Sequence, residues 1–260
     1  FGNEITITDV AFYSVSLKSG LIYVNDTWAA SDSPFLVTGD VTVNSDVTLT
    51  IEPGVEVRFT ELSDDLGTGN DQNRSELRVY GILIANGTAA DTIVFTSNAE
   101  SPVSGDWYGI YLQENNAGGS FKYNRIEYAT YGIRSSSLYG SPIDTIYATN
   151  SRIHNCGTGI DFNGSYRYEI IENNNLHDFS GRGIKMGWGD NGSGVINNNT
   201  ITNANGISIQ VEGKGTYEVA GNNIDGGSND GIRVGYMKSI TVRQNTVKNK
   251  GGDGIKIEYS

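Results

Sequence analysis

The second half of the sequence repeats with a period near 23 residues. Each unit has one apolar residue at its centre, and these are Ile126, Ile153, Leu176, Ile201, Ile224 and Val247. The isoleucines of successive Gly-Ile pairs keep nearly the same spacing: Ile110, Ile133, Ile160, Ile184, Ile207, Ile232 and Ile255. Repeats of about 20–50 residues are typical of stacked units, each too small to bury its own apolar face. The sequence therefore predicts a solenoid in which residues one period apart become neighbours on adjacent coils.

Within each unit, apolar and polar residues alternate, which indicates strands with one buried face. Alternation begins at Leu36, and polar loops interrupt it at 61–75 and 97–106. Turns are expected at Asp40, at Asn44-Ser45-Asp46 and at Glu52-Pro53-Gly54, and the 34 glycines indicate a turn-rich chain. Apolar residues at helical spacing are missing, so we expect an all-β chain.

A column of mostly Asn residues stands two positions before the central apolar residue. Its members are Asn124, Ser151, Asn174, Asn199, Asn222 and Asn245. Asn tolerates left-handed backbone and can hydrogen-bond to an Asn on the next coil. Such ladders recur where strands stack about 4.7–4.8 Å apart. The column therefore predicts parallel coils stacked in register.

The unit Asn199-Thr200-Ile201 with Gly206-Ile207-Ser208-Ile209 resembles the repeats of right-handed parallel β-helix proteins, which include pectate-lyase-like enzymes. The resemblance covers residues 107–260 well and 36–106 loosely. It implies a β-helix of roughly nine coils over residues 36–260. Residues 1–35 are aromatic-rich and outside the repeat, so we expect an N-terminal cap or docking segment there. This fold hosts lyases, hydrolases, adhesins and inert fibres, so it assigns no function.

Two rows of side chains beside the Gly-Ile strand are expected to face outward. The row one residue after each isoleucine is Tyr111, Arg134, Asp161, Lys185, Ser208, Arg233 and Lys256. The row two residues before it is Tyr108, Tyr131, Thr158, Arg182, Asn205, Asp230 and Asp253. Cations and flat rings suit an acidic polysaccharide. The carbohydrate-binding candidates are Arg182, Lys185, Trp188, Asp230, Arg233, Tyr236, Asp253 and Lys256.

Three interpretations of this face stay open. Its charges could simply pair with one another in solvent. A lyase would use Lys256, Lys185 or Arg233 as base and Asp230 or Asp253 as a Ca²⁺ ligand. A retaining glycosidase would use Asp230 and Asp253, whose backbones are expected about 4.8 Å apart. The Gly-His-Gly, Asn-Thr-Asp and Arg-Ile-Lys motifs of the polygalacturonases, which share this fold, do not occur in the sequence.

Both histidines fall in one column, one residue after the central apolar position. His154 and His177 are therefore expected to stack on adjacent coils, with Glu127 one coil further. These three side chains are candidate metal ligands, although a set along one flat row rarely closes a tetrahedron. Cys156, the single cysteine, falls in an apolar column and is expected to be a small core residue.

The formal net charge of −12 offers nucleic acid and anionic lipid surfaces no basic patch. It is compatible with Ca²⁺ binding. No apolar run approaches the ~20 residues of a membrane span. Asn-x-Ser/Thr sequences hint at a secreted or cell-surface protein and occur at Asn25, Asn73, Asn86, Asn163, Asn191 and Asn198.

The printed sequence stops in mid-repeat, where an open coil would leave backbone N–H and C=O groups unpaired. The chain could continue, its charges could blunt the last coil, or that coil could dock onto the first segment of another copy. The residues expected to form such an end-to-end assembly are Phe1, Ile5, Ile7, Phe12, Tyr13, Ile255, Ile257 and Tyr259. We therefore expect a non-catalytic extracellular structural module that can self-associate, with polysaccharide binding or cleavage as the alternative.

Overall fold

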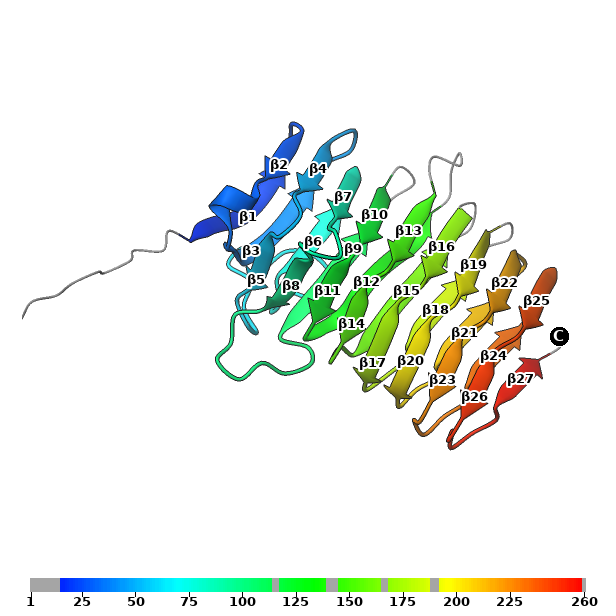
Figure 1. The fold of residues 1–260 in the computed structure, drawn as a ribbon. Coiled ribbons are helices and arrows are strands. Elements are labelled where there is room, and N and C mark those ends of the chain that lie inside the picture. The colour runs from blue at the N-terminus through cyan, green and yellow to red at the C-terminus, as the bar shows by residue number, and fades with distance from the viewer. Residues whose placement is uncertain (1–14, 114–116, 139–144, 165–167, 188–191, 259–260) are drawn as a thin grey trace, which may run out of the picture.

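The computed structural model describes residues 15–113, 117–138, 145–164, 168–187 and 192–258. In this part of the chain the backbone forms 27 strands and a single short 3-10 helix, η1 (Ala30–Asp32). The prediction of an all-β chain is confirmed. Figure 1 shows the strands stacked side by side along one axis, from the blue N-terminal strands to the red C-terminal ones.

Each coil contributes short strands to three parallel rows that run along the stack. Row A is β2 (Asp26–Trp28), β4 (Thr48–Ile51), β7 (Ile82–Asn86), β10 (Gly118–Lys122), β13 (Ile146–Thr149), β16 (Tyr168–Glu172), β19 (Ser193–Asn197), β22 (Thr216–Ala220) and β25 (Ser239–Arg243). Row B is β5 (Glu56–Phe59), β8 (Ile93–Ser97), β11 (Asn124–Glu127), β14 (Arg152–His154), β17 (Asn175–Phe179), β20 (Thr200–Ala204), β23 (Asn223–Asp225) and β26 (Thr246–Lys248). Row C is β6 (Glu76–Val79), β9 (Trp107–Leu112), β12 (Ala129–Leu138), β15 (Thr158–Gly164), β18 (Ile184–Gly187), β21 (Ile209–Glu212), β24 (Ile232–Gly235) and β27 (Ile255–Glu258). The longer strands β1 (Ser16–Ile22) and β3 (Phe35–Val43) span rows B and C.

The coils stack in register, as the repeat predicts. Ile126 pairs with Ile153, Leu176 with Ile201, and Ile224 with Val247, all in parallel. An inward column of row A is also in register, with its members buried or half-buried: Phe121, Ala148, Ile171, Ile196, Val219 and Val242. A parallel β-solenoid of about nine turns results.

The interior is a continuous apolar column along the stack. Large aromatic side chains fill much of the N-terminal half, where the rings of Phe59 and Trp107 stack with centroids 3.9 Å apart. Isoleucine, leucine and valine dominate the regular coils that follow. Since inward positions are packed, any chemistry belongs to the outward side chains of the three rows.

Two details differ from the sequence-based expectations. Asp40 lies inside strand β3 and is buried, although a turn was expected there. Strands β1 and β2 lie within the segment 1–35 and pair in parallel with β3 and β4, so the stack already includes part of that segment. The loops predicted at 61–75 and 97–106 contain no strand beyond Ser97.

Candidate functional site

The outward side chains of row C form one continuous ladder along the stack. Strand register places these residues one above the other: Thr42, Arg78, Tyr111, Arg134, Asp161, Lys185, Gln210, Arg233 and Lys256. The predicted row is confirmed except at Ser208, whose place Gln210 takes. Ser208 instead aligns with the glycine before the isoleucine, because Ile184 N–H donates to its carbonyl. Asn205 is likewise displaced from the second predicted row.

The C-terminal patch comprises Asp230, Arg233, Asp253 and Lys256, which the structure brings together as expected. Its central charges pair with each other: Arg233 donates to Asp230 Oδ2 from Nη2 at 2.6 Å and from Nε at 2.9 Å. Asp230 Oδ1 accepts the Asp253 backbone N–H at 2.9 Å. Burial acts to raise the pKa of Asp230, but these hydrogen bonds outweigh it and the pKa lies below its ordinary value. A lowered pKa suits a fixed anion better than a general acid.

The other predicted carbohydrate contacts are spread along the same face. Arg182 is exposed, and the Tyr236 ring is half exposed. Lys185 Nζ lies 3.4 Å from Asp161 Oδ1. Trp188 lies outside the described residues.

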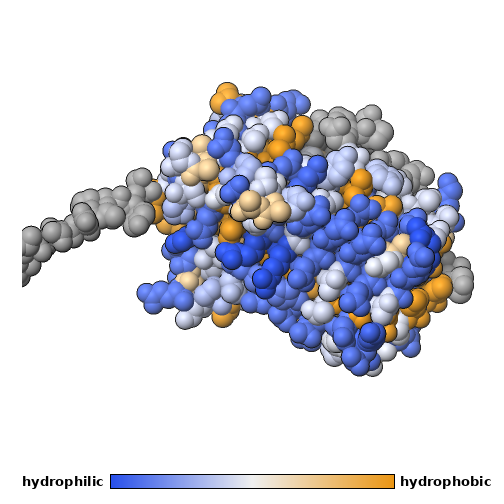
Figure 2. Space-filling view, in the orientation of Figure 1, coloured by the Kyte–Doolittle hydropathy of each residue, from blue (hydrophilic) through white to orange (hydrophobic). Residues whose placement is uncertain are grey.

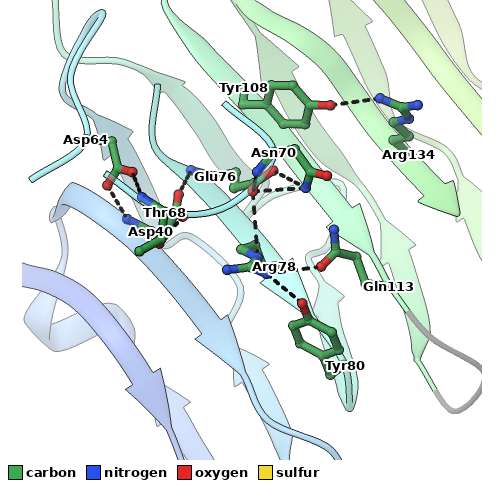
Figure 3. A network of polar contacts seen from close by, with 10 residues as sticks. All are labelled: Asp40, Asp64, Thr68, Asn70, Glu76, Arg78, Tyr80, Tyr108, Gln113 and Arg134. Atoms are coloured by element: carbon green, nitrogen blue, oxygen red, sulfur yellow. Dashed lines mark hydrogen bonds and ion pairs between the residues drawn. The ribbon is translucent and has the colours of Figure 1, made fainter. Parts of the chain in front are cut away.

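A cluster of tyrosines around Arg134 occupies the N-terminal half of row C. The Arg134 guanidinium lies over the Tyr131 ring at 4.4 Å and the Tyr111 ring at 5.2 Å. Its Nη1 donates to the Tyr108 hydroxyl at 2.8 Å (Figure 3). Burial raises the pKa of Tyr108 to about 12, against the opposing effect of Arg134. The phenol is therefore a hydrogen-bonding group at neutral pH rather than a base.

A second cation–aromatic group adjoins this cluster on β6 and the residues after β6 and β9. Arg78 lies over the Tyr80 ring at 5.4 Å, and its Nη2 donates to the Tyr80 hydroxyl at 2.6 Å. The same nitrogen lies 3.5 Å from Gln113 Oε1 (Figure 3). We call the two groups together the platform: Arg78, Tyr80, Tyr108, Tyr111, Gln113, Tyr131 and Arg134.

Two buried carboxyl groups lie beside the platform, beneath the loop 61–75. Asp40 is 1% exposed and Glu76 is 0% exposed. Glu76 accepts hydrogen bonds from the Asn70 backbone and side chain, and Asp40 accepts the Thr68 hydroxyl at 2.6 Å (Figure 3). A Cβ on Gly69 would collide with Glu76 Oε1 and lie 2.5 Å from Asp40 Oδ2, so both carboxyls converge on that loop backbone. The loop therefore closes over the pair.

Burial is the main cause of the raised pKa values of Asp40 and Glu76. Burial raises the pKa of Glu76 to about 7, despite the opposing hydrogen bonds from Asn70. It also raises the pKa of Asp40, despite hydrogen bonds from Thr68 and the Glu76 N–H. Arg78 Nε lies 3.7 Å from Glu76 Oε1, which links the pair electrostatically to the platform.

The histidine row is confirmed as a stack but not as a metal site. The His154 and His177 rings lie 4.7 Å apart at an interplanar angle of 4°, and His154 Nε2 lies 2.9 Å from Glu127 Oε2. Arg152 Nε donates to His177 Nε2 at 3.0 Å. Among the described residues, no three His, Cys, Asp or Glu side chains are grouped to hold a metal ion. Parallel stacking keeps the ring nitrogens from converging, so this geometry does not favour a metal site formed by Glu127, His154 and His177.

The assembly candidates are described only in part. Ile255 and Ile257 on β27 are 49% and 51% exposed. In Figure 2, hydrophilic residues cover most of the visible stack, and hydrophobic ones gather toward its C-terminal end. Phe1, Ile5, Ile7, Phe12, Tyr13 and Tyr259 lie outside the described residues. The described part of the chain contains no helix long and apolar enough to cross a membrane.

Sequence reasoning missed Asp40, Glu76, Arg78, Tyr80 and Gln113. Register places Asp40 opposite Glu76, directly before the paired core residues Val41 and Leu77. That alignment was hidden because the long loop 61–75 lies between the two strands. The tyrosines and Arg134 stood in the predicted rows but were not selected as candidates.

Comparison with known proteins supports the fold along most of the chain. Residues 137–260 match a family described as a right-handed β-helix region, and residues 20–118 match a pectate-lyase-like β-helix domain. No curated protein sequence matches significantly. A solved structure of the Streptococcus pneumoniae surface protein and adhesin PfbA is 11% identical over 94% of this chain and 91% of that one, with a TM-score of 0.22, too low to bear on function. The two family matches and the parallel three-row stack agree on a right-handed parallel β-helix fold for this chain.

Proposed function

We propose that this protein is an extracellular or cell-surface β-helix module that binds an acidic polysaccharide along row C, centred on the platform. The observation that carries the proposal is the guanidinium of Arg134 lying over two tyrosine rings and bonded to a third tyrosine. Tyrosine faces pack against sugar rings, and a guanidinium pairs with a carboxylate through two parallel hydrogen bonds. Lys185 of the ladder, and exposed Arg182 just before β18, lie further along the stack.

Binding is favoured over cleavage by the burial of the neighbouring acids. Asp40 and Glu76 lie beneath the loop 61–75, out of reach of a polymer on the surface. In the C-terminal patch, Arg233 and the Asp253 backbone already occupy the oxygens of Asp230. A glycosidase needs two carboxyl groups that flank the bond.

Affinity for polygalacturonate and alginate, with dextran as the neutral polymer, tests the proposal. Arg134→Ala and Tyr131→Ala are each expected to weaken polyuronate binding about tenfold, or about 1.4 kcal/mol. Arg243→Ala is the matched control, because Arg243 is an exposed cation on row A that pairs with Glu218. Equal binding to dextran, or unchanged affinity in both platform variants, would contradict the proposal.

A double variant, Arg233→Ala with Lys256→Ala, separates the platform from the C-terminal patch. If binding centres on the platform, the double variant keeps most of the affinity. Loss of binding only in the double variant would move the site to the patch predicted from the sequence.

End-to-end association stays a prediction. The half-exposed side chains of Ile255 and Ile257 are compatible with it. Sedimentation analysis over a range of protein concentrations tests it, and Ile257→Lys is expected to suppress any association. Ca²⁺ binding also stays a prediction, and a melting-temperature comparison with and without chelator tests it.

A further inference from the structure

Two arginines face each other on row B, on the other side of the β11–β12 corner from the platform. Register aligns Arg125 of β11 directly with Arg152 of β14. The outward residues of this ladder are Glu56, Val94, Arg125, Arg152, Asn175, Thr200, Asn223 and Thr246. The two arginines are thus consecutive cations, and the ladder's one anion over these strands, Glu56, lies two coils away from Arg125.

Like charges directly opposite each other on neighbouring strands destabilise a sheet. The nearby anions only partly offset this repulsion. Arg125 Nε lies 3.6 Å from Glu127 Oε1, but Glu127 also binds His154 and the Thr96 hydroxyl. Arg125 Nε is buried, and its N–H donates to no acceptor with good hydrogen-bond geometry. Arg152 donates to His177 and makes no ion pair with any carboxylate of the described residues.

A surface hollow opens beside this pair. Its volume is about 280 Å³. Its lining includes Thr92 and Val94, which are small or apolar. Tyr123 and Asn150 also line it, and both have left-handed backbone with φ of 53°. Both arginines and Tyr123 line the hollow, so two cationic residues and one aromatic residue border a single cavity.

We propose that this hollow binds an oxoanion group, a carboxylate, sulfate or phosphate, held between Arg125 and Arg152. A guanidinium binds such groups through parallel N–H···O bonds, and an anion between two cations removes their mutual repulsion. The Tyr123 ring offers an apolar face against which a sugar that carries the anion can pack. Because this site lies on row B, it does not depend on the platform or on the proposed polysaccharide.

The arginine Nε–H signals in ¹⁵N-correlated NMR spectra test this site directly. The probes are inorganic phosphate and D-glucuronate, each titrated to millimolar concentration at constant ionic strength. We expect saturable shifts of the Arg125 and Arg152 signals with at least one probe, while Arg243 and Arg58 stay unchanged. Saturation with glucuronate alone identifies a sugar acid as the preferred source of the anion, and saturation with phosphate alone identifies a phosphorylated ligand.

Variants complete the test. Arg125→Gln with Arg152→Gln is expected to abolish the saturable response, whereas Arg243→Gln keeps it. Should the double variant fold poorly, Arg152→Gln alone serves, because Arg152 is exposed; it is expected to weaken binding at least about fivefold, equivalent to about 1 kcal/mol. Shifts that do not saturate with either probe, or a full response that survives both substitutions, would overturn the proposal.

Discussion

The side-chain amide of Asn199 donates to Asn222 Oδ1 at 3.0 Å, and the backbone N–H of Asn199 donates to the same oxygen at 2.9 Å. The bonds repeat one coil earlier, where Asn174 donates to Asn199 Oδ1 from both its backbone and its side chain. Each amide therefore serves two coils at once. This column fixes the distance between neighbouring coils at the corner between rows A and B.

Asn199→Ala is expected to destabilise the stack. The substitution leaves the Asn174 N–H groups and the Ile171 carbonyl without their buried partner, and a buried unsatisfied group costs about 1–3 kcal/mol. We expect the free energy of unfolding to fall by at least about 2 kcal/mol in chemical denaturation. Thr200→Ala is the control, because that side chain is exposed on the next residue. An equal effect of both substitutions would show that the ladder adds no stability.

Gly109→Ala is expected to disrupt the platform through the backbone. Gly109 has φ of 141°, and a Cβ there would collide with the Tyr131 carbonyl oxygen on the next coil. Strained backbone alone costs about 1–3 kcal/mol, and the collision adds to it. Gly20→Ala is the control, because Gly20 has φ of 89° but open space around its Cα. The melting temperature is expected to fall more for Gly109→Ala than for Gly20→Ala. Equal decreases in the two variants would contradict the collision.

The sequence predicted the fold because periodicity constrains every coil at once. The spacing of Ile201 and Ile224, together with Asn199 and Asn222, already defined which residues face each other. The register of Ile207 was predicted wrongly for a physical reason. Side chains alternate with a period of two, so shifting Ile207-Ser208-Ile209 by two residues leaves the buried pattern unchanged. Only the hydrogen bond from Ile184 to the Ser208 carbonyl decides between the alternatives.

The candidate site was less predictable than the fold. Tyr108, Tyr131 and Arg134 were placed in the correct outward rows, but their convergence depends on side-chain rotamers that a repeat does not specify. Asp40 and Glu76 are brought together by coils of irregular length, and a long loop covers them. Irregular loops escape periodic reasoning, so the buried acids could not be found from spacing.

The thiol of Cys156 is expected to resist modification in the folded protein. Its side chain is 0% exposed, and burial raises the pKa of the thiol to about 12. Because the thiolate is the reactive form, an aromatic disulfide reagent should react slowly at pH 8 and quickly after denaturation. An added Ser33→Cys substitution, at a half-buried residue outside the core, gives the control for reagent access. Rapid reaction of native Cys156 would contradict the buried position.

Arg134→Lys tests whether planarity as well as charge matters in the platform. Lysine keeps the positive charge but loses the flat fork that lies over Tyr111 and Tyr131. We expect the dissociation constant for polygalacturonate to rise about fivefold, less than for Arg134→Ala. Wild-type affinity in Arg134→Lys would show that charge alone suffices.

The buried carboxyl group of Glu76 stabilises the folded state at low pH and loses this effect as the pH rises. Its folded pKa of about 7 lies above the ordinary 4.5, so the folded state binds more protons between these values. This contribution is fully present below pH 4.5, is lost as pH rises toward 7, and amounts to about 3 kcal/mol. Asp40, whose pKa is also raised, acts in the same direction.

Glu76→Gln isolates this contribution from the other titrating groups. Glutamine keeps the acceptor oxygen for Asn70 but carries no charge, so the variant is expected to be more stable than wild type at pH 8. At pH 4.5 the two proteins should differ little, because Glu76 is then protonated. Denaturant unfolding at both pH values measures the difference, and Glu61→Gln, at the exposed start of the same loop, controls for loss of one charge. If the difference in free energy of unfolding between Glu76→Gln and wild type stays constant from pH 4.5 to 8, Glu76 does not hold its proton beneath the loop.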